Sequence, residues 1–308
     1  MVCYHRLVMK RSYISLDEYL KNRFGEKVYK IALDGGMTCP NRDGTKGFGG
    51  CIFCSSGGSG EFAVKAVSDG RARPEAIDEA IARLTAHGKK TGSRYIAYFQ
   101  SYTNTYAPAD YLRELFSSAI SDERIVALSI GTRPDCLPLD VLELLGELNR
   151  QKPVWVELGL QTIHEHTAEI IRRGYPLSDF DRAVHELRSR GIEVIVHVIL
   201  GLPGESTGDM LETVRYLNQK DIQGVKFQQL YVLEGTDLAY MYRNDPDSLH
   251  ILSLEEYMDI LEQVIGELRE DIVVHRLTGD GPKNILLAPD WSRDKKNVLN
   301  TLKRHFTG

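Results

Sequence analysis

Three cysteines lie within sixteen residues near the start of the chain. Cys39, Cys51 and Cys54 are separated by eleven and by two residues, and the segment between them is rich in glycine. Glycine lets a backbone fold back on itself, so three thiolates in such a loop can converge on one object. Thiolates bind zinc and iron–sulfur clusters strongly. The residues of the loop alone leave open a zinc site, an iron–sulfur cluster and no metal at all.

The place of this loop in the chain favours the cluster. A structural zinc site normally takes four protein ligands, and the nearest histidines, His5 and His87, lie well outside the loop. A [4Fe–4S] cluster held by three cysteines leaves one iron without a protein ligand, where a substrate can bind. The loop also follows directly after the first strand of a predicted β/α repeat, which is where such proteins bind ligands. We therefore expect a catalytic cluster.

Short β-rich runs alternate with amphipathic helices along the rest of the chain. The predicted strands are Val28–Leu33, Tyr95–Gln100, Ile125–Ile130, Val154–Leu160, Glu193–Leu200 and Val225–Val232. The predicted helices are Pro74–Ala86, Ala109–Ser121, Leu139–Asn149, Ser178–Arg190, Ser206–Asn218 and Leu254–Arg269. Near-continuous apolar strands that alternate with helices predict an α/β fold with a parallel sheet covered by helices. Periodicity alone leaves open whether the sheet forms a partial barrel or an open doubly wound sheet.

This alternation divides the chain into three regions. Residues 1–27 form an N-terminal extension with a short helix over Leu16–Phe24, and residues 28–270 form the repeat itself. Residues 271–308 form a C-terminal tail with a strand over Ile272–His275 and a basic helix. The composition, with 42% hydrophobic and 26% charged residues and a net charge of −5, is typical of a globular protein. Because neither a membrane span nor a signal peptide is recognisable, we expect a cytoplasmic protein.

The cysteine loop resembles that of the radical S-adenosylmethionine (SAM) superfamily. In that family three cysteines bind a [4Fe–4S] cluster, and the remaining iron chelates the amino and carboxylate groups of SAM. The resemblance implies that Cys39, Cys51 and Cys54 hold the cluster, that Phe53 lies beside the adenine, and that the fold is a partial (β/α)6 TIM-type barrel. The common signature has three residues between its first two cysteines, whereas eleven intervene here. Similarly lengthened loops occur in the subgroup of the elongator catalytic subunit.

Later motifs extend the resemblance. Three segments are similar in order and spacing to the elongator subunit and to the oxygen-independent coproporphyrinogen oxidases: Val156–Gln161, Arg172–Tyr175 and His197–Gly204. In those families a Gln at a strand end and an Arg twelve residues later contact SAM, which points to Gln161 and Arg173. His197 matches a position that touches the ribose, and Gly201 begins a turn that lets backbone approach the adenine. Each of the three side chains also has a plainer interpretation, as surface polarity or, for His197, as a core histidine.

Two places depart from these relatives. Many members carry a glycine-rich run after the second strand to seat the SAM amine, and here Gln100–Asn104 stands instead. We expect Ser101 to supply a hydrogen bond there. Relatives also place a Glu before Thr-Arg-Pro-Asp, whereas Gly131 precedes Thr132 here. We expect Thr132 to take over part of the role of that carboxylate.

Polar residues on the same rim are candidates for contacting the substrate. They are Arg133, Asp135, Gln228, Gln229, Tyr231 and, in the glycine-rich tail segment, Lys283. Arg133 and Asp135 can equally form a buried structural pair. The segment with Lys283 closes over the barrel mouth, grips phosphate, or is an ordered structural loop. Cys136 is more simply a buried thiol than a hydrogen donor or a further ligand.

The nearest overall likeness is to a small bacterial group related to the elongator subunit but without its acetyltransferase domain. That subunit acts on wobble uridine in tRNA. The resemblance therefore implies an enzyme that cleaves SAM reductively to a 5′-deoxyadenosyl radical and modifies the C5 substituent of a wobble uridine. It also implies a one-electron reductant such as flavodoxin or ferredoxin.

Charge gives this tRNA substrate little support. The basic clusters at 89–94 and 295–304 are ordinary for solvated faces, and the acidic net charge weighs mildly against RNA. The alternatives are a radical SAM enzyme acting on a small metabolite and a non-enzymatic scaffold that binds zinc.

Overall fold

An eight-stranded parallel sheet forms the centre of the molecule. The computed structural model describes residues 13–86 and 88–307, so Cys3, His5 and His87 lie outside the described residues. The strand order is β11-β9-β8-β7-β6-β5-β1-β2, and neighbouring strands run parallel. The strands are β1 (Tyr29–Asp34), β2 (Val64–Lys65), β5 (Tyr95–Phe99), β6 (Ile125–Thr132), β7 (Val154–Gln161), β8 (Glu193–Leu200), β9 (Gly224–Gln229) and β11 (Val273–Arg276).

The helices match the predicted ones to within two residues. They are α1 (Leu16–Phe24), α2 (Ala76–Thr85), α3 (Ala109–Ser121), α4 (Leu139–Asn149), α6 (Leu177–Ser189), α7 (Thr207–Asn218) and α9 (Leu254–Glu267). The basic helix of the tail is α10 (Lys295–Thr307). Two helices were not predicted, α5 (Glu165–Ile170) and α8 (Asp237–Asn244). They have six and eight residues, which is too short for a periodic pattern to be recognised.

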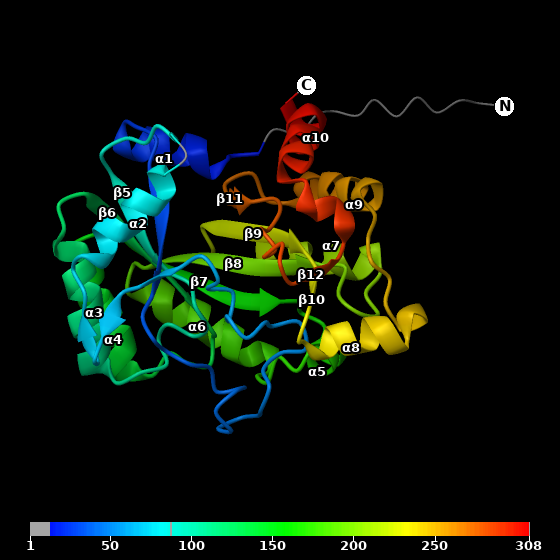
Figure 1. Cartoon of the computed structure of the whole chain (residues 1–308), viewed down its shortest axis with the longest axis horizontal. Coiled ribbons are helices and arrows are strands. Elements are labelled where there is room, and N and C mark those ends of the chain that lie inside the picture. The colour runs from blue at the N-terminus through cyan, green and yellow to red at the C-terminus, as the bar shows by residue number, and fades with distance from the viewer. Residues whose placement is uncertain (1–12, 87, 308) are drawn as a thin grey trace.

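The predicted partial α/β barrel is confirmed. The six predicted strands are β1 and β5 to β9, which are neighbours in the sheet, while β2 and β11 extend it at its two edges. Figure 1 shows the sheet in the middle of the molecule, with α3 and α4 on one side and α9 and α10 on the other. Two antiparallel ribbons lie outside the sheet: β3 (Val67–Ser68) with β4 (Arg71–Ala72), and β10 (Val232–Leu233) with β12 (Leu286–Ala288).

Alternation along each strand separates the outer core from the barrel interior. Leu158 and Val196 are fully buried in the large core between the sheet and the helices. Successive side chains of a strand point to opposite faces, so Glu157 and His197 point into the interior. Apolar strands thus carry polar side chains on their inner face, where they meet the side chains of other strands.

Helix α1 closes the amino end of the barrel. Its N-cap Ser15 accepts a hydrogen bond from the Glu18 amide, and Gly25 ends it in a left-handed conformation. Leu20 of α1 packs in a separate apolar cluster with Ile96 and Trp155 from the strands. Ligands therefore reach the interior from the carboxyl ends of the strands, which is the functional end of α/β barrels. Among the described helices, none is both long and apolar enough to cross a membrane.

Candidate functional site

The cysteine loop leaves β1 at its carboxyl end and is anchored between two helices that the sequence did not predict. The amide of Ile52 donates to the carbonyl of Ile171, just after α5, and the amide of Leu238 in α8 donates to the carbonyl of Ile52. Within the loop, the amide of Cys54 donates to the carbonyl of Cys51 at 2.9 Å. The last two cysteines therefore share one tight turn that is fixed on both sides by the barrel. Phe53 lies in this turn and packs against the apolar cluster formed there.

The three thiols of this loop influence one another electrostatically. Burial raises the pKa of Cys51 to about 12, and the neighbouring Cys54 and Cys39 add to that effect. Burial also raises the pKa of Cys54, where Cys39 again contributes. A metal centre that binds thiolates supplies the positive charge that such a buried set lacks. The three thiols can therefore serve as ligands of one metal centre.

Asn41 links the cysteine loop to the barrel. Its buried side-chain amide donates to the carbonyl of Arg172 at 2.7 Å and to that of Arg173 at 3.1 Å, and it lies 3.7 Å from Cys51 Sγ. On the other side of the amide, a Cβ atom at Gly174 would lie 2.5 Å from Asn41 Oδ1. Glycine at 174 therefore permits the close approach that brings an N–H donor to a cluster sulfur. Sequence reasoning missed this residue because its partners are 131 and 132 residues away.

Arg133 and Asp135 form the second link. The guanidinium donates two hydrogen bonds of 2.9 Å to the carboxylate and a third to the carbonyl of Arg173. Lys46 of the cysteine loop lies 2.7 Å from the same carboxylate. Burial alone would raise the pKa of Asp135, but Arg133 and Lys46 outweigh it and hold that pKa below its ordinary value. The geometry is that of the buried structural pair, and a substrate contact by these residues stays a prediction.

Arg173 is almost fully buried, and its guanidinium is engaged by the protein. It donates to the carbonyls of Thr162 at 2.6 Å and Tyr175 at 3.1 Å, and to the carboxylate of Glu165 at 3.0 Å. These bonds shape the turn that follows β7. A direct contact between Arg173 and SAM stays a prediction, and two of its N–H groups remain for it.

Two of the predicted SAM contacts carry polar atoms without partners. Ser101 Oγ and Gln161 Oε1 are buried and accept no hydrogen bond from the described residues. Gln161 also has a φ of +69°, which is costly for a residue other than glycine. Buried orphan atoms and backbone strain at a strand end are typical of a ligand site. Gly60 packs on Ser101, since a Cβ there would lie 1.9 Å from the hydroxyl oxygen.

The remaining predicted SAM contacts lie at the same end of the strands. The hydroxyl of Thr132 is 2.6 Å from that of Thr105. Gly201 has a φ of +81°, and a Cβ there would lie 2.8 Å from Leu252, so only glycine fits. His197 lies deeper, on β8, where its Nε2 is 3.1 Å from Arg276 Nη2. Their roles toward SAM stay predictions.

Four predicted substrate candidates belong to the final third of the chain. Gln228 accepts a hydrogen bond from Arg276, and Gln229 donates to the hydroxyl of Tyr231 at 2.9 Å. Burial raises the pKa of Tyr231. The side chain of Lys283 is exposed, and the structure does not bring it to the interior polar groups.

The sequence analysis did not predict the layer of charged side chains that lies inside the barrel. Both oxygens of Glu157 on β7 are bonded to lysines, one to Lys30 of β1 and the other to Lys226 of β9. Ser129 donates to the same carboxylate at 2.7 Å, and Tyr98 lies 3.3 Å from the Lys226 ammonium. The available signal was a charged residue between apolar neighbours in each of three strands, at a position whose side chain points to the inner face.

The interior lowers the pKa of its basic groups. Burial lowers the pKa of Lys226 to about 7, against the opposing effect of Glu157. Burial and the nearby Arg276 lower the pKa of His197 to about 3, so this imidazole is neutral. Burial would raise the pKa of Glu157, but the two lysines hold it well below its ordinary value. The layer thus contains one carboxylate among several basic groups.

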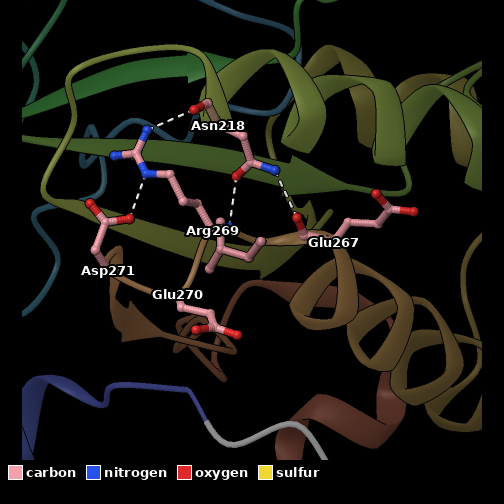
Figure 2. A pocket seen from close by; sticks show the side chains of 6 residues that line it. Asn218, Glu267, Arg269, Glu270 and Asp271 are labelled. Carbon is pink, nitrogen blue, oxygen red and sulfur yellow. Dashed lines mark hydrogen bonds and ion pairs between the residues drawn. The ribbon is translucent and has the colours of Figure 1, made fainter.

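A surface pocket at the other end of the barrel is structural. Figure 2 shows its lining, in which Asn218, Arg269 and Asp271 bond to one another or to the backbone. Arg269 also donates to the carbonyls of Asn218 at 2.6 Å and Lys220 at 3.0 Å. These bonds fix the connection from α7 to β9 and from α9 to β11, far along the strands from the cysteine loop.

Comparisons with known proteins agree with this geometry. Residues 39–217 match the model of the radical SAM superfamily, and residues 222–307 match the radical SAM C-terminal domain. The chain is 42% identical to the protein YtqA of Bacillus subtilis, over 96% of this chain and 90% of the relative. It is 28% identical to a tRNA uridine(34) acetyltransferase of Methanocaldococcus jannaschii, over 54% of this chain and 30% of the relative.

Solved structures share the fold. An archaeal Elp3 from Methanocaldococcus infernus is similar with a TM-score of 0.61 and 19% identity, over 75% of this chain and 59% of that one. The coproporphyrinogen III oxidase HemN of Escherichia coli is similar with a TM-score of 0.51 and 16% identity, over 81% of this chain and 54% of that one. With the matched family models spanning most of its length, this chain belongs to the radical SAM superfamily, whose enzymes use a [4Fe–4S] cluster and SAM.

Proposed function

We propose that this radical SAM enzyme modifies tRNA at the C5 substituent of a wobble uridine. The observation that carries the proposal is the similarity to tRNA uridine(34) acetyltransferases, which falls on about half of this chain. The match to the fold of an archaeal Elp3 adds support. The chain covers only 30% of that acetyltransferase, so the proposed chemistry is that of the shared radical SAM part.

The proposed cluster ligands are Cys39, Cys51 and Cys54. The mutual electrostatic influence of their thiols supports this assignment. When bound, the cluster and SAM supply an electron and a 5′-deoxyadenosyl radical that abstracts hydrogen from carbon. Asn41 and Lys46 bond the loop to the barrel. The turn before Cys54 is hydrogen-bonded to the end of α5 and to α8.

Ser101 and Gln161 are the proposed hydrogen-bonding partners of SAM, because both carry a buried atom without a protein partner. Phe53 is proposed to lie beside the adenine, and Thr132, Arg173, His197 and Gly201 to complete the site. A one-electron donor such as flavodoxin or ferredoxin is the proposed partner, and the cytoplasm is the proposed compartment. Tail residues Lys296 and Arg304 are exposed on α10 and offer phosphate contacts, whereas the neighbouring Lys295 pairs with Asp280.

The cluster assignment is tested with Cys54→Ala, and Cys136→Ala serves as a matched control. Cys136 is a buried thiol outside the loop. After anaerobic reconstitution we expect Cys54→Ala to lose the cluster and the release of 5′-deoxyadenosine from SAM, while Cys136→Ala keeps both. An intact cubane and a normal rate in Cys54→Ala would remove the assignment.

The substrate is tested by mass spectrometry of tRNA nucleosides from a strain lacking the gene. We expect one modified wobble uridine to disappear and to return when the wild-type gene, but not the Cys54→Ala gene, is restored. If the wobble-uridine profile is the same with and without the gene, the tRNA proposal is wrong. The second candidate is then a small metabolite, which the charged interior of the barrel favours because an anionic small molecule fits basic side chains.

A further inference from the structure

Three basic side chains lie next to one another across three parallel strands. Arg276 of β11 is in register with Lys226 of β9, and Lys226 is in register with His197 of β8. The register of β11 shifts between Val274 and Arg276, which brings Arg276 to this position. Like charges directly opposite one another destabilise a sheet. A sequence that keeps Arg276 beside Lys226 in a partly buried place therefore calls for a compensating anion.

Glu157 does not compensate Arg276. Its two carboxylate oxygens are bonded to Lys30 and Lys226. Counted with Arg276, the layer has three cationic side chains and one carboxylate. One or two positive charges thus remain, depending on the protonation of Lys226.

The partners of Arg276 are neutral. Its Nη2 donates to Gln228 Oε1 and, at 3.1 Å, to His197 Nε2. A guanidinium has donors only, so His197 accepts and is unprotonated at this nitrogen. The Nε–H of Arg276 is buried without a hydrogen-bond partner, and in the described part of the chain no carboxylate forms an ion pair with this residue. A buried charge without a counter-charge is costly unless a ligand supplies one.

We propose that Arg276 and Lys226, with Gln228 beside them, bind an anionic oxygen group, a carboxylate or a phosphate, that the substrate carries into the barrel. This anion differs from the carboxylate of SAM, which the resemblance places on the cluster iron at the mouth. The inference rests on the proposed function in one respect, that the barrel interior receives the substrate. The inference states the chemical class of the substrate group that binds at Arg276 and Lys226, which is an acidic group.

The test uses anaerobically reconstituted holoenzyme saturated with SAM. Thermal unfolding is followed while sodium acetate or sodium phosphate replaces sodium chloride at constant ionic strength. A ligand that binds only the folded state raises the melting temperature in a saturable way. We expect such a rise with acetate if the group is a carboxylate, and with phosphate if it is a phosphate.

Variants locate the effect. We expect Arg276→Gln to need at least about tenfold more anion for the same rise, because a hydrogen-bonded charge is lost. Arg276→Lys should retain part of the effect. Arg182→Gln is the matched control, since Arg182 is an exposed surface residue paired with Asp179 on α6, and it should behave as wild type. If Arg276→Gln does not fold, Lys226→Gln takes its place, because Glu157 keeps Lys30 and Ser129 as partners.

Two outcomes overturn the inference. One is that neither anion raises the melting temperature of the wild type above that in chloride. The other is an equal rise in the wild type and in the folded variant, Arg276→Gln or Lys226→Gln. Either result leaves the tRNA nucleoside profile untouched. Conversely, an unchanged nucleoside profile would remove the tRNA proposal without affecting the binding of acetate or phosphate, so the two failures are distinguishable.

Discussion

Glu157→Gln is the substitution that tests the charged layer most directly. The carboxylate is only 4% exposed and bonds to Lys30, Lys226 and Ser129. The amide keeps the volume and one acceptor but removes the only carboxylate in the described part of the chain that is bonded to these two lysines. Breaking a buried ion pair by removing one partner costs about 3–5 kcal/mol. Here Lys226 can lose its proton and Lys30 is 16% exposed, so we expect the lower value, about 3 kcal/mol at pH 7.

The pKa of Lys226 determines how the loss of stability in Glu157→Gln depends on pH. The folded pKa of Lys226, about 7, lies below its ordinary value. Its contribution to stability is therefore fully present above the unfolded pKa and is lost as the pH falls from there to the folded pKa of about 7. Without Glu157 the remaining positive charges repel more strongly, and neutralising Lys226 relieves that repulsion. We expect the loss in Glu157→Gln to be smaller at pH 9 than at pH 7.

Urea denaturation of the reduced protein at both pH values measures this loss. The matched control is Glu193→Gln, on β8, whose carboxylate pairs with Arg23 and is 22% exposed. This pair is partly exposed and therefore screened by water, so the control should lose less than Glu157→Gln. If Glu157→Gln loses no more free energy of unfolding than Glu193→Gln, or if its loss is larger at pH 9, then the account of the charged interior is wrong.

Three further predictions concern the same interior and the cysteine loop. Replacing Lys226 by Met should flatten the rise in unfolding free energy between pH 7 and 10 by up to about 1.4 kcal/mol per pH unit, as measured by denaturation at several pH values. Asn41→Ala removes an N–H donor near Cys51 Sγ and should shift the cluster potential by about 40 mV to more negative values, which a redox titration followed by electron paramagnetic resonance will detect; an unchanged potential would contradict the role of Asn41. Gly174→Ala should lower both the melting temperature and the iron content, because its Cβ would collide with Asn41. Gly204→Ala has a similar φ of +81° with nothing within 4 Å, so equal iron loss in both variants would mean that backbone strain, rather than the collision, is responsible.

The cysteine loop and the order of strands and helices could be predicted from local information. The spacing of Cys39, Cys51 and Cys54 needs no tertiary contact to be recognised, and amphipathic periods of strands and helices are properties of short segments. For the same reason the positions of Ser101 and Gln161 at strand ends were predictable. Their lack of a partner was not, since it depends on every neighbouring segment.

The tertiary structure alone decided which polar residues meet. Glu157 is 127 residues from Lys30 and 69 residues from Lys226 along the chain. Asn41 bonds to a turn more than 130 residues away. Arg276 follows a register shift between β9 and β11 that no local pattern reveals. Sequence by itself determined the alternation of strands and helices and the candidate thiol ligands, because side-chain period and cysteine spacing are local. The structure determined the charge of the interior, because closing a sheet into a barrel brings distant strands to one axis, where low dielectric makes each unpaired charge matter.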